Sequence, residues 1–358
     1  MTTFELVKAL CDIDGVSGAE DKVCDYIEAL VKDCCDCKVD ARGNLICFKK
    51  GKKTPAKKIM LSAHMDEVGF VVTGIDDDGF LRFSTVGGIA SRVVIGKRVR
   101  LESGIPAIVG TKPIHMQSAD EQNTPLKISD MYLDIGAKNK EDALESVSLG
   151  DTAAFFSNTV LFGNDRIKAK ALDDRAGCAC LIQLLQQEAE YVFTACLTVC
   201  EECGKSGADN AAYSVQPDIA IVVECTTAAD VHGVGELDQV VNQGKGPAFV
   251  LMDTRCIYDR ALFKKGMAIA KEHNVPCQVK RATSGATDAA VIQTMGAGVK
   301  VMGVSMPGRY IHSASSTLKL SDIDATTQLL GHLVNGLANL ETFLCGTMEN
   351  NCRRILTH

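Results

Sequence analysis

The chain has 358 residues but no tryptophan, and it contains only six tyrosines and eight prolines. It also lacks an apolar run of the roughly 18 residues that a membrane-spanning helix needs. Its N-terminal segment carries acidic residues early, without the basic and apolar regions of a signal peptide. We therefore expect no membrane association, and we assign the protein to the cytoplasm.

An excess of positive charge is also missing. The 38 Lys and Arg residues are outnumbered by 45 Asp and Glu residues, which gives a formal net charge of −7 at pH 7. No dense basic patch with interleaved aromatic residues occurs along the chain. These features argue against nucleic acid or an anionic membrane surface as the main partner.

The 16 cysteines do not form the motif of a structural zinc site. Cys200 and Cys203 make a C-x-x-C, but we do not expect the cysteines to supply the four thiolate ligands of a tetrahedral zinc site. A redox role for that pair is an alternative, but we favour packing. Cys34, Cys35 and Cys37 form a separate group. We interpret most of the cysteines as reduced thiols that pack as small apolar residues.

The length favours two domains or one domain with a large insertion. Residues 1–68 and 165–358 show buried strand-like runs alternating with helical patterns, which predicts an α/β domain with a mixed, mostly parallel sheet flanked by helices. Residues 69–164 show short β runs broken by turn signals, which predicts an inserted small β-barrel. Within that insertion, residues 149–162 are expected to form a closing hairpin.

Polar residues stand where the apolar runs stop. In open α/β sheets, ligands bind beyond the carboxyl ends of the strands, so such residues can converge although they are distant in sequence. The runs at 57–63, 193–200, 218–223 and 299–311 are followed by His64, by Glu201 and Glu202, by Glu224, and by His312. Asp66, two positions after His64, is expected to accept the other ring N–H of that histidine as its orienting partner.

Two imidazoles with several carboxylates suit zinc, cobalt or manganese better than a thiolate site. An oxygen-rich set of this kind also suits a pair of ions bridged by one carboxylate. Adjacent side chains in extended backbone point to opposite sides, so Glu201 and Glu202 are expected to divide the work. One would bind a metal, and the other would take a proton from a metal-activated water.

Several motifs together resemble the M42 family of metallo-aminopeptidases. The resemblance runs from GVSGAED at 15–21 to the final helix, with the motifs in the expected order. They are ALDDRAG at 171–177, the acids at 201–202 with Gly204 and Gly207-Ala208, VECTTAAD at 223–230, GKGPA at 244–248, SGATDAA at 284–290 and RYIHS at 309–313.

The resemblance implies a dinuclear aminopeptidase that removes N-terminal residues from peptides. It assigns Asp173 as the bridge between two divalent ions. We expect these ions to be zinc or cobalt, with manganese as an alternative. It also assigns the remaining ligands and the catalytic base: His64 and Glu224 for one ion, Glu202 and His312 for the other, and Glu201 as general base. It further implies a cis peptide at 173–174 and a homo-oligomer, in many members a tetrahedral dodecamer assembled through the β insertion.

Some positions depart from the family pattern or stay open. Glu224 stands where many members have Asp, and Ser316 and His232 also replace other common residues. His115 is expected to be structural, whereas His232 and Asp288 keep open roles near the substrate. Two other functions remain as alternatives: a glycoside or other amide hydrolase on the same scaffold, and a non-catalytic peptide-binding assembly protein.

Overall fold

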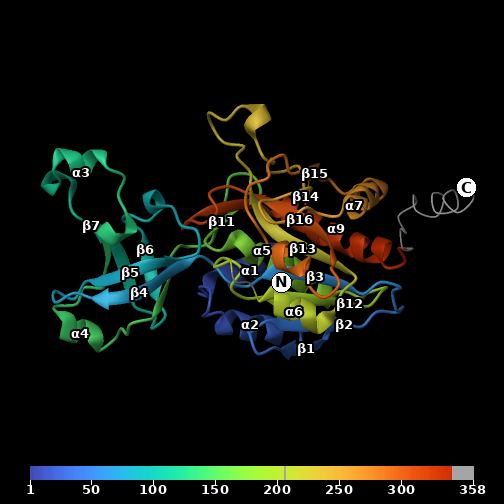
Figure 1. Cartoon of the computed structure of the whole chain (residues 1–358), viewed down its shortest axis with the longest axis horizontal. Coiled ribbons are helices and arrows are strands. Elements are labelled where there is room, and N and C mark those ends of the chain that lie inside the picture. The colour runs from blue at the N-terminus through green and yellow to red at the C-terminus, as the bar shows by residue number, and fades with distance from the viewer. Residues whose placement is uncertain (205–206, 341–358) are drawn as a thin grey trace, which may run out of the picture.

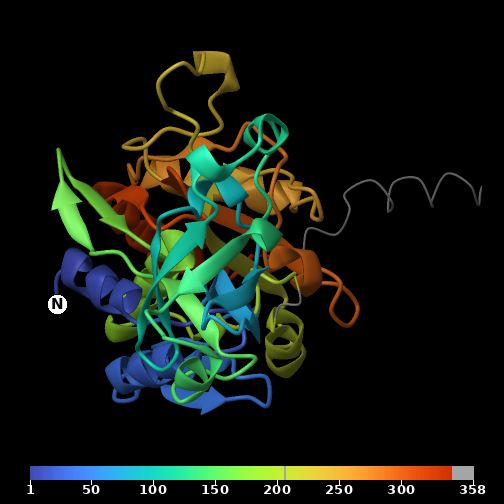
Figure 2. The same ribbon diagram turned by 90° about the vertical axis from the view of Figure 1, so that its left-hand side faces the viewer.

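The computed structural model describes residues 1–204 and 207–340, and it shows a layered α/β unit beside a closed β-barrel (Figure 1). Viewed from the barrel side, the barrel strands lie in front of the layered unit (Figure 2). The predicted fold class, a mixed sheet with helices and an inserted β-barrel, is confirmed. No helix in the described part of the chain is long and apolar enough to cross a membrane.

An eight-stranded sheet forms the middle layer of the α/β unit. Its four central strands, β12, β3, β13 and β16, are parallel, and they are the apolar runs expected from the sequence. The spatial order is β1 (Asp36–Val39), β2 (Leu45–Lys49), β12 (Phe193–Thr198), β3 (Ile59–His64), β13 (Ile219–Thr227), β16 (Lys300–Gly308), β14 (Ala248–Val250) and β15 (Gln278–Val279).

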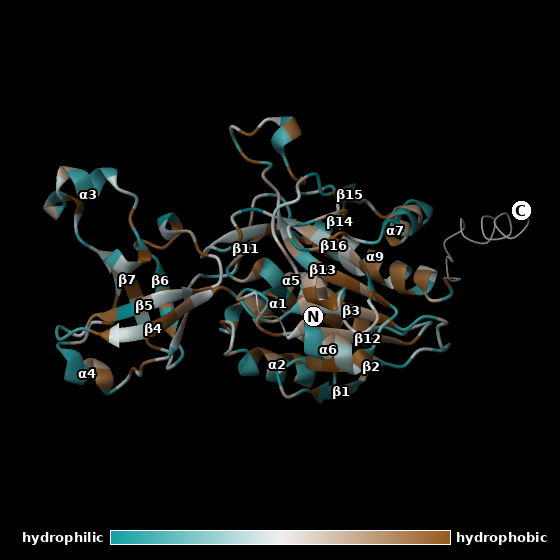
Figure 3. Ribbon diagram, viewed as in Figure 1, coloured by the Kyte–Doolittle hydropathy of each residue, from teal (hydrophilic) through white to brown (hydrophobic). Residues whose placement is uncertain are grey.

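Helices cover both faces of this sheet, which explains why its central strands are apolar along their whole length. Alternate strand residues serve the two faces: Leu61 belongs to the core of the first and Met60 to that of the second. The strands are accordingly brown in Figure 3. The first face carries α1 (Thr3–Asp12), α2 (Asp21–Val31), α5 (Leu172–Gln186), α7 (Arg260–Glu272) and α9 (Leu320–Leu337), and the second carries α6 (Ala208–Val215) and α8 (Ala289–Ile292).

The barrel has its own apolar core. Phe70 is fully buried there, and its ring meets Phe83 and Phe155 edge to face, with centroids 5.2 and 5.1 Å apart. The barrel strands in order are β4 (Gly69–Ile75), β5 (Leu81–Val86), β8 (Met131–Asp134), β7 (Pro106–Thr111), β6 (Arg98–Leu101) and β9 (Thr152–Phe155). Short helices α3 (Ala119–Asn123) and α4 (Lys140–Leu144) lie at its ends, and 3₁₀ turns occur at Ser91–Val93, Ile114–Met116, Ile128–Asp130 and, in the α/β unit, Glu236–Asp238.

The expected closing hairpin at 149–162 is wrong. Strand β9 does close the barrel, between β4 and β6, but β10 (Val160–Phe162) instead joins β11 (Arg166–Ala169) and β17 (Ser316–Lys319) in a separate antiparallel sheet. The linking segment is held by outside partners: Thr159 Oγ1 donates to Asp12, and Lys168 Nζ donates to Ser157 Oγ. These bonds replace a tight turn between β9 and β10.

Candidate metal centre

The predicted site residues gather at the carboxyl ends of the central parallel strands. His64 is the last residue of β3, Glu224 lies within β13, and Glu201 and Glu202 follow β12. His312 follows β16, and Asp173 lies in the first turn of helix α5. All six line one cavity of about 690 Å³, so sequence positions 64 to 312 meet in one place.

The first cluster surrounds His64, which is 2% exposed. Its Nε2 atom lies 3.2 Å from Glu224 Oε1 and 3.6 Å from Asp173 Oδ1. Its Nδ1 atom lies 3.1 Å from the carbonyl oxygen of Asp66, which can only accept, so Nδ1 carries the proton. Nε2 is therefore the nitrogen left to bind a metal ion once its proton is displaced, and it lies beside the two carboxylates.

The second cluster surrounds His312. Its Nε2 atom lies 3.1 Å from Glu202 Oε2 and 3.4 Å from Asp173 Oδ2. Its Nδ1 atom donates to the main-chain oxygen of Gly88 at 2.9 Å, in the loop that leaves strand β5 of the barrel. Asp173 thus offers one oxygen to each histidine cluster, and the barrel loop sets the orientation of His312.

Orphaned oxygens test whether these residues suit cations. Asp173 Oδ1 and Glu202 Oε1 are buried and find no hydrogen-bond donor among the described residues. Ligand atoms of His64, Asp174 and Glu224 lie within 4.8 Å of one another, and so do those of Asp173, Glu202 and His312. Buried carboxylates without donors are costly unless a cation pairs with them. The donor set therefore fits one divalent ion in each cluster.

The pKa values report the same excess of negative charge. Burial opposes the charge on His312, yet Asp173 and Glu202 raise its pKa to about 11. For His64, burial is likewise outweighed, mainly by Glu224 and Asp173, and its pKa lies well above the usual range. Burial, together with Asp173, raises the pKa of Glu224 to about 8 although His64 opposes that rise. The cluster compensates its carboxylates with protons, a role that metal ions can take over.

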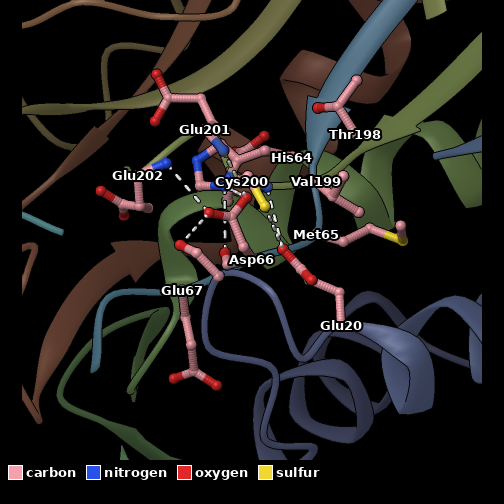
Figure 4. Close-up of polar contacts among 12 residues, drawn as sticks. Glu20, His64, Met65, Asp66, Glu67, Thr198, Val199, Cys200, Glu201 and Glu202 are labelled. Carbon is pink, nitrogen blue, oxygen red and sulfur yellow. Dashed lines mark hydrogen bonds and ion pairs between the residues drawn. The ribbon is translucent and has the colours of Figure 1, made fainter. Parts of the chain in front are cut away.

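Asp66 holds the ends of two strands together (Figure 4). Its Oδ1 accepts from Glu201 N at 3.1 Å and lies 3.2 Å from His64 Nδ1. Its Oδ2 accepts from Glu202 N at 3.1 Å and from Ser17 Oγ at 2.6 Å. Burial raises the pKa of Asp66, but His64 and these donors outweigh burial and lower it, so the carboxylate is charged.

Glu201 and Glu202 point apart from neighbouring positions (Figure 4). Glu202 pairs with His312, whereas the Glu201 carboxylate makes no such pair and lines the cavity. Burial, reinforced by Glu224, raises the pKa of Glu201 well above the usual range. The chain turns between strand and acids at Cys200, which has a left-handed φ of 59° and whose N–H donates to Glu20 at 3.0 Å. A carboxyl with a raised pKa beside the two histidine clusters suits proton transfer.

Asp174 is a residue that the sequence reasoning left without a role. The Asp173–Asp174 peptide is cis, as the resemblance implied. The Asp174 carboxylate accepts from Gly177 N at 3.2 Å and lies within 4.8 Å of ligand atoms of His64 and Glu224. Burial and Glu224 raise its pKa well above the usual range. It is therefore a further oxygen donor within reach of the first cluster.

The remaining candidates lie outside the two clusters. His115 and His232 are exposed on a barrel loop and on the loop after β13. Asp288 occupies the N-cap position of α8 but makes no capping bond with its side chain; its Oδ2 accepts from Thr198 Oγ1 at 2.6 Å and Ser62 Oγ at 3.1 Å. Asp288 thus ties β3 to β12 beneath the cavity.

The sequence reasoning also missed two cations in the cavity wall. Lys280 is only 8% exposed, and its Nζ donates to the main-chain oxygen of Ser284 at 2.8 Å. Burial lowers the pKa of Lys280, although Asp253 and Glu224 oppose that shift. Arg255 lines the same cavity from an exposed position. Neither residue ends a strand-like apolar run, so no pattern singled them out.

The Cys200–Cys203 pair shows no redox bridge. Both thiols are free, and Cys203 is exposed. The Cys200 thiol contacts Glu20 Oε1 at 3.5 Å, and burial raises its pKa to about 12. A high pKa makes Cys200 a poor nucleophile at neutral pH, which agrees with the packing interpretation.

Comparison with known proteins identifies the family. The sequence model of the M42 glutamyl aminopeptidase family matches residues 43–329. A putative aminopeptidase from Acetivibrio thermocellus is 40% identical, with 91% of this chain and 97% of that protein covered.

Among solved structures, an aminopeptidase from Desulfurococcus kamchatkensis matches with a TM-score of 0.88 and 32% identity, over 93% of this chain and 94% of the other. The TET1 peptidase of Pyrococcus horikoshii, described as assembling into a tetrahedron or a large octahedral shell, matches with a TM-score of 0.83 and 33% identity, over 95% and 100%. The chain therefore belongs to the M42 family and is a metallo-aminopeptidase.

Proposed function

We propose that the protein is a dinuclear aminopeptidase that uses Asp173 as the bridge between two divalent ions. The observation that carries the proposal is the geometry of Asp173, whose two oxygens face His64 and His312 separately. Glu224 belongs to the first site and Glu202 to the second. Asp174 is an added oxygen donor for the first site.

Bound at these positions, divalent ions would polarise the scissile carbonyl and lower the pKa of water so that it attacks at neutral pH. Glu201 accepts the proton of the attacking water, because its carboxylate lines the cavity and makes no ion pair with either histidine. It then delivers that proton to the leaving amine. Asp66 keeps Glu201 and Glu202 in their separate orientations through the two main-chain N–H groups.

Buried acids also favour a substrate with a free amino terminus. The cavity floor holds Asp173, Glu202 and Glu224, which attract an ammonium group as well as metal ions. Zinc, cobalt and manganese all accept this mixed nitrogen and oxygen donor set. Peptides with free N-termini are therefore the proposed substrates.

The proposed assembly is a homo-oligomer, with a tetrahedral dodecamer as the specific form. Its support is the assembly of the Pyrococcus horikoshii relative and an apolar edge on this chain. All three residues of strand β10, Val160, Leu161 and Phe162, are more than 40% exposed. The proposed location is the cytoplasm, because the cysteines in the described residues are free thiols, as a reducing compartment would keep them.

Hydrolysis of aminoacyl chromogenic substrates by metal-free protein tests the activity. Zinc, cobalt or manganese should each be added in turn, with an N-acetylated peptide and a β-glucan as controls. We expect metal-dependent release from free amino termini only. Cleavage of the blocked peptide or the glucan, without cleavage of any free amine, would overturn the proposal in favour of the other hydrolase classes.

The Glu201→Gln variant tests the base. It should keep both metals but lose about 10²–10⁴-fold in kcat, the usual contribution of general base catalysis. Glu141→Gln, in the exposed helix α4 of the barrel, makes the same chemical change away from the cavity and should leave kcat unchanged. Near-wild-type turnover in Glu201→Gln would remove Glu201 from the mechanism.

A further inference from the structure

Three thiols meet at the edge of the eight-stranded sheet that is formed by strands β1 and β2. Cys37 lies in β1 and Cys47 directly faces it in β2, while Cys35 comes just before β1. The sulfur of Cys37 lies 3.4 Å from that of Cys47 and 3.5 Å from that of Cys35. All three sulfurs fall within 4.8 Å of one another, so they form one compact cluster.

The surroundings of this thiol cluster combine access with positive charge. Cys47 is fully buried, whereas Cys35 and Cys37 are half-buried and open to solvent. A hydrogen bond with the Cys47 thiol, helped by Cys37 and Lys49, lowers the pKa of Cys35 to about 7 despite partial burial. Lys49 is itself buried and donates to the carbonyl oxygens of Cys34 and Leu185. Lys49 thus holds a fixed positive charge beside the thiol cluster.

We propose that Cys35, Cys37 and Cys47 form a second metal centre that binds one soft, thiophilic ion, with Cu(I) as the best match. Thiolate-only ligand sets select Cu(I) over harder ions. A disulfide would use two of these sulfurs, whereas a trigonal ion uses all three. Metal–sulfur bonds of about 2.3 Å hold three ligands about 4 Å apart in a plane. The Cys35–Cys37 and Cys37–Cys47 pairs therefore need to widen by only about half an ångström.

This thiol cluster is distinct from the carboxylate and histidine centre in both place and chemistry. Strands β2 and β12 lie between β1 and β3. With neighbouring strands about 4.8 Å apart, β1 is about 14 Å from β3. The catalytic centre offers nitrogen and oxygen donors, which suit harder ions. The two centres can therefore be loaded and measured independently.

Binding at the cluster releases protons. Burial raises the pKa of Cys37 to about 12, and the hydrogen bond with Cys35, together with burial, raises the pKa of Cys47. A metal ion must displace both thiol protons, so the affinity should rise with pH. The Cys35 thiol also contacts the carbonyl oxygen of Val31 at 3.3 Å, at the end of α2. Metal binding removes the proton of this contact as well.

Titration with Cu(I) tests the proposal. The full-length protein should compete with a chromophoric Cu(I) chelator under anaerobic, reducing conditions. We expect one Cu(I) per subunit for the wild type, and at least tenfold weaker binding for Cys37→Ser. Cys277→Ser, which removes a half-buried thiol beside Met267, should bind like the wild type. Equal binding by Cys37→Ser, or none by the wild type, would overturn the proposal.

An alkylation footprint on the wild type does not depend on the variants folding. One equivalent of Cu(I) should protect Cys35 and Cys37 together, as read by mass spectrometry, and leave exposed Cys203 reactive. Protection of other cysteines instead would overturn the assignment. Formation of a disulfide within the cluster by hydroperoxide, with no Cu(I) bound, would also overturn it and mark a redox site.

Discussion

Replacing Asp66 with Asn should separate the orientation of the metal ligands from the general stability of the fold. Both oxygens of Asp66 accept hydrogen bonds: Oδ1 serves Glu201 N and His64, and Oδ2 serves Glu202 N and Ser17. An amide has only one accepting oxygen. Whichever way the amide turns, its NH₂ group faces a main-chain N–H that it cannot satisfy.

The expected cost follows from the number of bonds lost. A hydrogen bond to a charged group is worth about 1.5–3 kcal/mol. One such bond is lost if the Ser17 hydroxyl reverses to accept, and two are lost if the NH₂ group faces Glu201 N and His64. Asp66→Asn should therefore lose about 1.5–6 kcal/mol in free energy of unfolding. Loss of an orienting partner of this kind typically weakens metal binding by about 10–100-fold.

The assay pairs chemical unfolding with competition against a chromophoric metal chelator, and it needs a matched control. Asp322 is 1% exposed and accepts from Gly244 N at 2.7 Å and Gly246 N at 2.9 Å, away from the metal centre. Asp322→Asn should destabilise the protein without changing metal affinity. If Asp66→Asn binds metal as tightly as the wild type, or if both variants lose affinity equally, the orienting role is refuted.

Three further predictions concern substrate choice, the barrel and acid stability. Because Lys280 places a buried ammonium in the cavity wall, substrates with N-terminal Glu or Asp should be preferred. Lys280→Met should lower kcat/KM for a Glu substrate at least tenfold and change kcat/KM for a Leu substrate by no more than about threefold. Equal losses on both substrates would contradict the assignment. Phe70→Ala should cost about 3–5 kcal/mol in urea unfolding, because it empties the barrel core; a loss below about 1 kcal/mol would show that this core contributes little. Burial opposes ionisation of Asp14, but Arg100 and Lys170 outweigh burial and lower the pKa of Asp14. The ionised carboxylate therefore stabilises the fold above the unfolded pKa of about 3.9, and this contribution is lost as the pH falls through the lower folded value. Below about pH 4, the melting temperature of Asp14→Asn should fall less with pH than that of the wild type.

The strand-end residues could be located from sequence because two simple rules apply to them. Buried parallel strands are apolar throughout, so β3, β12, β13 and β16 stand out, and their carboxyl ends meet at one edge. His64, Glu224 and His312 follow directly from those rules. Asp173 lies at the start of a helix, where no such rule applies, and its position needed the family resemblance.

The supporting contacts could not be predicted, because loops and long sequence separations decide them. Ser17 reaches Asp66 across 49 positions, and Gly88 reaches His312 across 224. Local patterns report the face of an element and carry no information on such pairs. The misplaced hairpin has the same origin: strand β10 is apolar like β9, and only its partners β11 and β17 distinguish it.

The bond from His312 to Gly88 also bears on how such a chain can change over generations. Gly87, next to Gly88, has a left-handed φ of 81°, and a Cβ there would lie 2.7 Å from Val68 Cγ1 and 3.3 Å from Glu202 Cβ. The barrel loop therefore passes close to Glu202, one proposed metal ligand, and orients His312, another. A recombination event or an engineered chimera that exchanges the barrel must keep this loop intact to keep catalysis. The insertion is thus inherited together with the active site, and its outer surface is the part that remains free to diversify.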